Sequence, residues 1–254
     1  MKLENIVITG ATSELAVNLA NRANELGFNL ILISRGEQKK LAPINGTIIK
    51  QMDGIDLSDE LQQTTIRELI ENTFHSKFGL IHFAGDFWTH KPLVHTEFSE
   101  IKGMMNSHYF TLCNVVQVVT PIMIKLGGGK LIAFSCNSVS YNYPDMIPFT
   151  CAKSAIETFI KCYGNEYAEY GINSLAIALP TILTERVKQE KPNGDHENYV
   201  TPQEVSDIII EQLIQLNQFV NGNVVKIFRH STSFYNQGYF ERNPRIKRID
   251  ENGG

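Results

Sequence analysis

The segment Asn5-Ile6-Val7-Ile8-Thr9-Gly10-Ala11-Thr12-Ser13-Glu14-Leu15-Ala16 begins with five β-prone residues and continues through a glycine turn into a helical pattern. A glycine in such a turn lets an anion approach the backbone N–H groups at the start of a helix. The segment therefore predicts a strand–turn–helix unit that could hold a phosphate-bearing ligand. The turn alone does not identify a site, so its meaning depends on the rest of the chain.

Short apolar runs alternate with longer helical patterns over the rest of the chain. The runs mostly do not alternate polar with apolar residues, which is typical of strands buried on both faces. We expect strands at Asn5–Thr9, Asn29–Ser34, Gly46–Lys50, Gly79–Phe83, Lys130–Ser135, Ile172–Ala178 and Val224–Phe228. We expect helices at Ser13–Leu26, Leu57–His75, Ser99–Leu126, Ile147–Tyr170 and Pro202–Leu216.

This alternation indicates βαβ units, and hence a parallel sheet with helices on both faces. Right-handed crossovers narrow the topology to a doubly wound, Rossmann-like sheet of about seven strands. The chain shows no internal repeat, low-complexity tract or linker-like stretch. We therefore expect an α/β protein in which residues 1–254 form a single domain.

The composition excludes several classes of function. A net charge of −4 gives no basic field, so we expect neither a nucleic-acid nor a membrane partner. The four cysteines form no C-x-x-C pair, which argues against a disulfide framework. The seven histidines show no metal-ligand spacing, so we expect no metal and interpret them as structural or solvent-facing. Since the first residues contain no signal-peptide core, we expect a cytoplasmic protein.

Further motifs follow in order along the chain. Ser34-Arg35 ends the second expected strand, where an acid would bind ribose hydroxyls and an arginine accommodates a 2′-phosphate. The later motifs are Asp56-Leu57-Ser58, His82-Phe83-Ala84-Gly85, Asn106, Lys153 and Pro180-Thr181-Ile182-Leu183-Thr184. In this order and spacing they resemble the short-chain dehydrogenase/reductase family over nearly the whole chain.

The resemblance implies an oxidoreductase with an NADP(H) cofactor, and Arg35 makes NAD(H) the less favoured one. It implies a cofactor site at Gly10, Thr12, Ser13, Glu14, Leu15, Arg35, Asp56, Leu57, Ala84, Gly85, Lys153, Pro180, Ile182 and Thr184. It also implies a small-molecule substrate and a homodimer or homotetramer.

The first turn departs from the family's TGxxxGxG pattern, because Glu14 and Ala16 stand at its second and third glycines. The helix dipole favours a carboxylate in the first helical turn. The same carboxylate could compete with a pyrophosphate for N–H groups, depending on where the side chain points. In the family's NNAG segment only the small pair Ala84-Gly85 is retained.

The catalytic segment departs most. The family's YxxxK reads Phe149-Thr150-Cys151-Ala152-Lys153, and the family's serine position is Cys136. In the family the tyrosine hydroxyl protonates the substrate oxygen, while the lysine lowers the tyrosine pKa and holds the nicotinamide ribose. A positioned general acid contributes about 10²–10⁴ in rate, so reduction by that mechanism should be slow here. The catalytic candidates are Asn106, Cys136, Ser138, Tyr143, Phe149 and Lys153, with Tyr141 as a further hydroxyl.

Several of these residues also have a plain structural interpretation. Arg35 could belong to a solvated run with Lys39 and Lys40, and Asp56 could simply cap the helix expected after it. Tyr141 and Tyr143 could pack rather than act. Asn106 is unfavourable inside a helix, which favours a specific hydrogen-bonding role.

The polar loop after Thr184 lies at the family's substrate-lid position and suits a charged or polyhydroxylated substrate, such as a sugar or its activated derivative. We expect the aromatic and basic tail at 230–254 to pack on the domain or on a neighbouring subunit. The leading function is thus an NADP(H)-dependent oxidoreductase with a non-standard proton donor. A catalytically silent dinucleotide-binding scaffold and a C=C reductase, in which the tyrosine is dispensable, remain alternatives.

Overall fold

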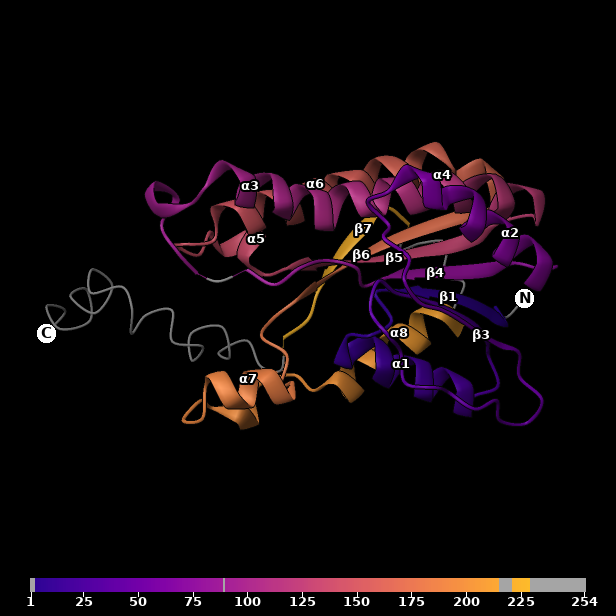
Figure 1. The fold of residues 1–254 in the computed structure, drawn as a ribbon, viewed down its shortest axis with the longest axis horizontal. Coiled ribbons are helices and arrows are strands. Elements are labelled where there is room, and N and C mark those ends of the chain that lie inside the picture. The colour runs from indigo at the N-terminus through magenta and orange to yellow at the C-terminus, as the bar shows by residue number, and fades with distance from the viewer. Residues whose placement is uncertain (1–2, 89, 215–220, 229–254) are drawn as a thin grey trace, which may run out of the picture.

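The computed structural model describes residues 3–88, 90–214 and 221–228, and its centre is an all-parallel sheet (Figure 1). The strand order is β3-β2-β1-β4-β5-β6-β7, so the chain winds outward in both directions from β1 and β4. The strands are β1 (Asn5–Thr9), β2 (Asn29–Ile33), β3 (Ile49–Met52), β4 (Phe78–His82), β5 (Gly129–Cys136), β6 (Ile172–Leu179) and β7 (Asn223–Lys226). The doubly wound, Rossmann-like fold expected from the sequence is confirmed.

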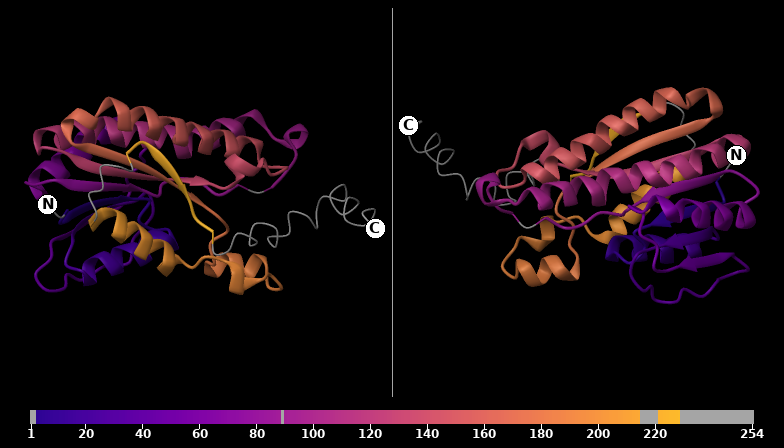
Figure 2. Two further views of the ribbon diagram at one scale, coloured as in Figure 1. Left: turned by 180° about the vertical axis from the view of Figure 1, so that it is seen from behind. Right: turned by 45° about the horizontal axis from the view of Figure 1, so that its top comes forward.

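Helices cover both faces of the sheet (Figures 1 and 2). One layer holds α1 (Glu14–Glu25) and α8 (Pro202–Ile214), and the other holds α2 (Gln63–Thr73), α4 (Thr111–Lys125) and α6 (Ile147–Glu166).

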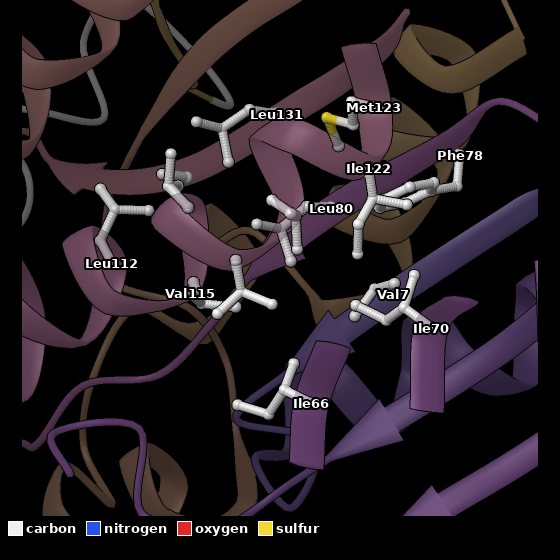
Figure 3. Close-up of a cluster of buried hydrophobic side chains, with 14 of the residues drawn as sticks. Val7, Ile66, Ile70, Phe78, Leu80, Leu112, Val115, Ile122, Met123 and Leu131 are labelled. Carbon is white, nitrogen blue, oxygen red and sulfur yellow. The ribbon is translucent and has the colours of Figure 1, made fainter. Parts of the chain in front are cut away.

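Neighbouring residues of each strand point to opposite layers, since side chains alternate along a strand. On β1, Val7 joins the buried cluster under α2 and α4 (Figure 3), whereas Ile6 and Ile8 join the cluster under α1 and α8. Both clusters exclude water from the central strands, which explains why these strands read as continuous apolar runs.

The long helix expected at Ser99–Leu126 is interrupted. The structure has α3 (Phe98–Met105), a π-helical turn (Asn106–Phe110) and then α4. The Thr111 hydroxyl donates to the Ser107 carbonyl at 2.8 Å, a carbonyl that regular α-helix would pair with the Thr111 N–H. A π turn holds one extra residue, so it rotates every later side chain relative to a regular helix.

Three other expectations were wrong in detail. The third strand begins at Ile49 rather than Gly46, and the next helix begins with a 3₁₀ turn (Glu60–Gln62) capped by Asp59 rather than Asp56. The Asp56 carboxylate instead accepts from the Ser58 N–H at 2.9 Å and from the Ser58 hydroxyl at 2.7 Å.

The loop expected after Thr184 contains α7 (Glu185–Glu190). The remaining short elements are the 3₁₀ turns Leu93–His95, Ala168–Tyr170 and His196–Asn198, and α5 (Ser138–Tyr141). The tail at 230–254 lies outside the described residues. Within the described ranges, no helix has the length and apolar character needed to cross a bilayer.

Gly10 makes the first turn possible. Its φ of +69° lies in the left-handed region, and a Cβ there would approach the Ala84 nitrogen to 2.6 Å. The turn after β1 therefore rests directly on the backbone at the end of β4, which brings the two segments together.

Replacement of Gly10 by alanine should destabilise the protein more than replacement of Gly46. Both glycines have positive φ, +69° and +80°, but nothing lies within 4 Å of a Cβ at Gly46. Gly46→Ala should therefore cost about 1–2 kcal/mol from backbone strain alone. Gly10→Ala should cost about 1–3 kcal/mol more, because the β4 backbone must move. Equal losses in urea unfolding would contradict the close approach.

Candidate active site

The predicted site residues gather at one edge of the sheet. The strands are parallel, so their carboxyl ends meet there, at the end where α5 and α7 lie (Figure 1). Gly10 follows β1, Arg35 follows β2, Ala84 follows β4 and Pro180 follows β6. In open α/β sheets this edge is where ligands bind.

Phe149 and Lys153 lie one helical turn apart on α6 and share one face. The Lys153 ammonium donates to the Phe134 carbonyl at 2.9 Å and lies 5.5 Å from the centre of the Phe149 ring. Lys153 is only 8% exposed, and no carboxylate of the described residues forms an ion pair with it. Burial lowers the Lys153 pKa to about 8, and the Cys136 thiol partly opposes this shift.

His82 ends β4 and joins three elements. Its Nδ1 lies 2.8 Å from the Thr9 hydroxyl, and its Nε2 lies 3.3 Å from the Thr111 hydroxyl. Since Thr111 donates to the Ser107 carbonyl, we assign the Nε2–H tautomer, in which Thr9 donates to Nδ1. Burial and the charge of Lys153 lower the His82 pKa to about 3. The imidazole is therefore neutral and acts as a fixed crosslink.

His108 lies in the π turn and faces Phe149, with ring centres 5.3 Å apart and nearly perpendicular planes. Its Nε2 lies 2.9 Å from the Asp86 carbonyl, and its buried Nδ1 has no partner among the described residues. A Cβ on Gly85 would come within 2.1 Å of this Nδ1, so only glycine fits beside the ring. Burial is the main cause that lowers the His108 pKa well below its usual value, and the positive charge of Lys153 is the second cause.

Asn106 lies outside the buried group around Phe149, and its catalytic role stays a prediction. Asn106 is exposed at the first position of the π turn, and its side chain makes no hydrogen bond within the described residues. His108, two residues later, holds the buried place beside Phe149 and Lys153. The extra residue of the π turn shifts which side chains face inward, and a regular helical pattern does not reveal that shift.

The predicted candidates near the Phe149 and Lys153 face of α6 are Cys136, Ser138 and Tyr143. The Cys136 sulfur accepts from the Ser138 N–H at 3.4 Å, and the fully buried Ser138 hydroxyl accepts from Thr150 at 3.2 Å. Tyr143 stacks on Tyr141 with ring centres 6.4 Å apart. These three residues lie where the site is expected. None of the contacts just given joins one of their hydroxyl groups to a base or a cation.

A small apolar cluster borders Phe149. Trp88, Met104, Met146 and Ala152 form its buried part, and Phe149 and Tyr143 pack against it. The Trp88 indole donates to the Asp145 carbonyl at 2.8 Å, which joins the loop after β4 to the segment before α6.

The start of α1 offers free donors. The Ser13 hydroxyl caps the helix by accepting from the Ala16 N–H at 3.2 Å. The N–H groups of Glu14 and Leu15 have no acceptor within the described residues. The Glu14 carboxylate points away from its own helix and accepts from the Glu185 N–H at 2.9 Å, at the first residue of α7.

Arg35 lies at the far end of this edge. It is exposed and pairs with Asp86 at 3.2 Å, and its charge contributes to the lowered pKa of Asp56, after the two Ser58 hydrogen bonds. Leu57, also expected at the cofactor site, is buried.

The segment after β6 crosses the edge. Ile182 forms a bridge to Val200, and Thr184 caps α7 by accepting from the Val187 N–H. Arg186 stacks on the exposed Phe87 ring at 3.7 Å. Contacts of α7 with α1 and with the loop after β4 thus enclose the edge from the side opposite α6.

Sequence reasoning missed His82, His108 and Trp88. The histidines carry no metal-ligand spacing, and the described residues contain no group of side chains suited to a metal. The available signal was position: His82 replaces the first asparagine of the NNAG-like segment, and Trp88 follows it closely.

Comparison with known proteins bears on the family and the fold. The family model for short chain dehydrogenases matches residues 4–195. The chain is 24% identical to the fatty acyl-CoA reductase of Acinetobacter baylyi over 222 residues, which cover 82% of this chain and 72% of the relative. It is 22% identical to the human very-long-chain 3-oxoacyl-CoA reductase over 199 residues, 74% of this chain and 62% of the relative.

A third relative is the inactive hydroxysteroid dehydrogenase-like protein 1 of Pongo abelii, 28% identical over 172 residues, which cover 65% of this chain and 52% of that protein. The chain thus spans less than two thirds of the length of the second and third relatives.

Among solved structures, a tyrosine-to-phenylalanine variant of ElxO with NADPH bound has a TM-score of 0.79 and 21% identity, covering 95% of this chain and 100% of the other. At that identity the likeness shows the fold alone. Together with the match over residues 4–195, the carboxyl-edge site and the parallel sheet lead to one conclusion. The chain belongs to the short-chain dehydrogenase/reductase family.

Proposed function

We propose that this protein is an NADP(H)-dependent oxidoreductase that reduces a carbonyl group without a tyrosine hydroxyl. The observation that carries the proposal is the buried charge of Lys153 beside Phe149 at the carboxyl edge, which pairs with no carboxylate of the described residues. Burying a cation without a counter-charge is costly, and such groups concentrate at functional sites. A decayed site would be under no constraint to keep it.

The residues present fit a dinucleotide. The free N–H groups of Glu14 and Leu15 suit a pyrophosphate at the start of a helix, and Gly10 lets that turn lie close to β4. Arg35 would meet a 2′-phosphate, while Asp56, Leu57, Ala84 and Gly85 border the adenosine side. Lys153 would hold the nicotinamide ribose, with Thr12, Ser13, Pro180, Ile182 and Thr184 completing the site.

A bound nicotinamide supplies the hydride, and the chain supplies orientation and a proton. His82 fixes the end of β4 to β1 and α4, so the floor of the site cannot shift. The apolar cluster around Trp88 and Met146 keeps water from the side of Phe149. The exclusion of water strengthens the interactions of Lys153 with polar groups nearby.

The substrate class has two candidates. The polar α7 segment supports the small polar, sugar-related carbonyl compound expected from the sequence. The methionine-rich cluster beside Phe149 supports a carbonyl compound with an aliphatic part, and two relatives are named for acyl-CoA substrates. A homodimer or homotetramer acting in the cytoplasm completes the proposal.

The alternative is a silent dinucleotide-binding scaffold. One relative is named as inactive, and a phenylalanine variant of ElxO is named as binding NADPH. Loss of the tyrosine is therefore compatible with cofactor binding whether or not chemistry survives.

The protein should bind NADPH at least about tenfold more tightly than NADH, because an arginine–phosphate contact contributes roughly 1.5–3 kcal/mol. Titrations can follow the fluorescence of Trp88, the single tryptophan. Arg35→Ala should remove most of the preference, whereas Lys40→Ala, an exposed cation of the same loop, should retain it. Equal affinity of the wild-type protein for the two cofactors would refute the assignment of Arg35, and no binding of either would refute the cofactor site.

Removal of the Glu14 charge should tighten NADPH binding. A carboxylate beside an anion at a helix N-terminus costs about 0.3–1 kcal/mol, which corresponds to roughly two- to fivefold in Kd. Glu14→Gln retains an acceptor for the Glu185 N–H, and Glu14→Gly removes it as well. Glu25→Gln, at the exposed far end of α1, is the control. If all three variants bind NADPH as the wild type does, the carboxylate lies outside the pyrophosphate site.

Phe149→Tyr separates the enzyme from the scaffold. If another group already donates the proton, the new hydroxyl should change kcat/KM for NADPH-dependent ketone reduction by less than about tenfold. If the wild-type protein is silent, the variant should reduce the ketone faster than the wild-type background. The expected increase is about the 10²–10⁴ in rate that a general acid contributes. Ser138→Ala, Tyr141→Phe and Tyr143→Phe complete the set, and a loss confined to one of them would identify that hydroxyl as the donor.

A further inference from the structure

Three titratable groups are buried around Phe149: His82, His108 and Lys153. They come from different elements, namely the end of β4, the π turn and α6. Phe149 itself has no hydroxyl, so another group near it supplies the proton that a reduced carbonyl oxygen takes up. The phenylalanine variants of Tyr141 and Tyr143 described above test those two hydroxyls as alternatives.

The two histidines are poor acids in this place. Burial holds the pKa of each well below its ordinary value, so both rings are neutral near pH 7. The ring of His82 is fixed between Thr9 and Thr111. The Nε2 of His108 is paired with the Asp86 carbonyl, and its Nδ1 is then an acceptor.

The hydroxyl and thiol groups are less suited as well. Ser138 is fully buried and bonded to Thr150. Cys136 accepts from the Ser138 N–H. Both groups are neutral and already engaged, whereas an ammonium is a charged acid.

The Lys153 ammonium has more N–H groups than acceptors among the described residues. It carries three N–H groups, and within the described residues a single acceptor, the Phe134 carbonyl, is bonded to it. The ammonium lies over the Phe149 ring, 5.5 Å from the ring centre, and is therefore close to the residue at which the family carries its proton donor.

On the basis of the proposed carbonyl reduction, we infer that the Lys153 ammonium itself delivers the proton to the substrate oxygen. A hydride from NADPH forms the new C–H bond, the carbonyl π pair moves to oxygen, and an O–H bond forms as an Nζ–H bond breaks. The products are an alcohol, NADP⁺ and a neutral lysine, which regains a proton from solvent before the next turnover. Lys153 is then a catalytic residue rather than only a ribose-binding one.

The charge environment suits this role. The groups that face Lys153 are Cys136 on β5, His82 on β4 and His108 in the π turn, and burial lowers the Lys153 pKa to about 8. Below pH 8 the ammonium is protonated and can donate, and above pH 8 it loses the proton. Reduction should therefore be constant below about pH 8 and fall tenfold per pH unit above it.

The test uses the full-length chain, NADPH, and two probe substrates, dihydroxyacetone and acetoacetyl-CoA. Lys153→Arg retains a positive charge but cannot release a proton, since the arginine pKa exceeds about 12. We expect this variant to reduce the hydride-transfer rate about 10²–10⁴-fold in single turnovers and to abolish the decline above pH 8. Its Kd for NADPH, measured separately by Trp88 fluorescence, distinguishes lost chemistry from lost cofactor.

Lys130→Arg is the matched control. Lys130 is the other buried lysine of the described chain, 2% exposed at the opposite end of β5 and bonded to the Gln212 carbonyl. Its replacement should leave the rate and pH profile unchanged. Lys153→Ala should regain activity with added alkylamines, at rates that follow the amine pKa, which a merely structural lysine would not show.

The outcomes separate the two proposals. If the wild type binds NADPH but transfers no hydride to either probe, the proposed function fails and this inference fails with it. If the wild type is active and Lys153→Arg retains both its rate and its decline above pH 8, only the present inference is overturned. The double variant Phe149→Tyr/Lys153→Arg should recover part of the rate, which shows that an inactive Lys153→Arg protein is still folded.

Discussion

The burial of one positive charge at the carboxyl edge of the sheet determines the rest of the candidate site. Lys153 reaches the Phe134 carbonyl from α6 and lies beneath the Phe149 ring, with no carboxylate of the described residues paired to it. The site tolerates this charge because its neighbours are uncharged: both histidines are held neutral by burial and by Lys153 itself. The lysine and the histidines therefore form one electrostatic unit.

The surroundings of Phe149 are closely packed. Phenylalanine packs against the Trp88 and Met146 cluster, and the His108 ring meets it edge-on. Gly85 is required by this ring, since any side chain there would overlap Nδ1. Histidines thus lie at the end of β4 and in the π turn. His82 bonds the hydroxyls of Thr9 and Thr111, and His108 bonds the backbone carbonyl of Asp86. The surroundings of Phe149 are therefore packed and hydrogen-bonded on several sides.

The opposite side of the edge is organised by backbone and exposed charge. The start of α1 has free N–H groups, and Glu14 spans from there to α7. The Arg186 guanidinium stacks on the Phe87 ring, which joins α7 to the loop after β4. These contacts are exposed and individually weak, so a ligand can displace them at small cost. The rigid, buried side and the exposed, displaceable side together make an edge that can admit a large cofactor and still fix its reactive end.

The sequence by itself determined the α/β class, the doubly wound sheet and the family, because buried parallel strands and glycine turns leave a local pattern in the chain. It also identified Gly10, Phe149 and Lys153, whose spacing is fixed within single elements. It did not indicate the buried position of His108, since a π turn changes the helical phase without a periodic signal. The partners of His82 and Glu14 lie 73 and 171 residues away in the chain. Those contacts, and the burial that sets the pKa of Lys153, exist only once the strand ends and helices meet at one edge.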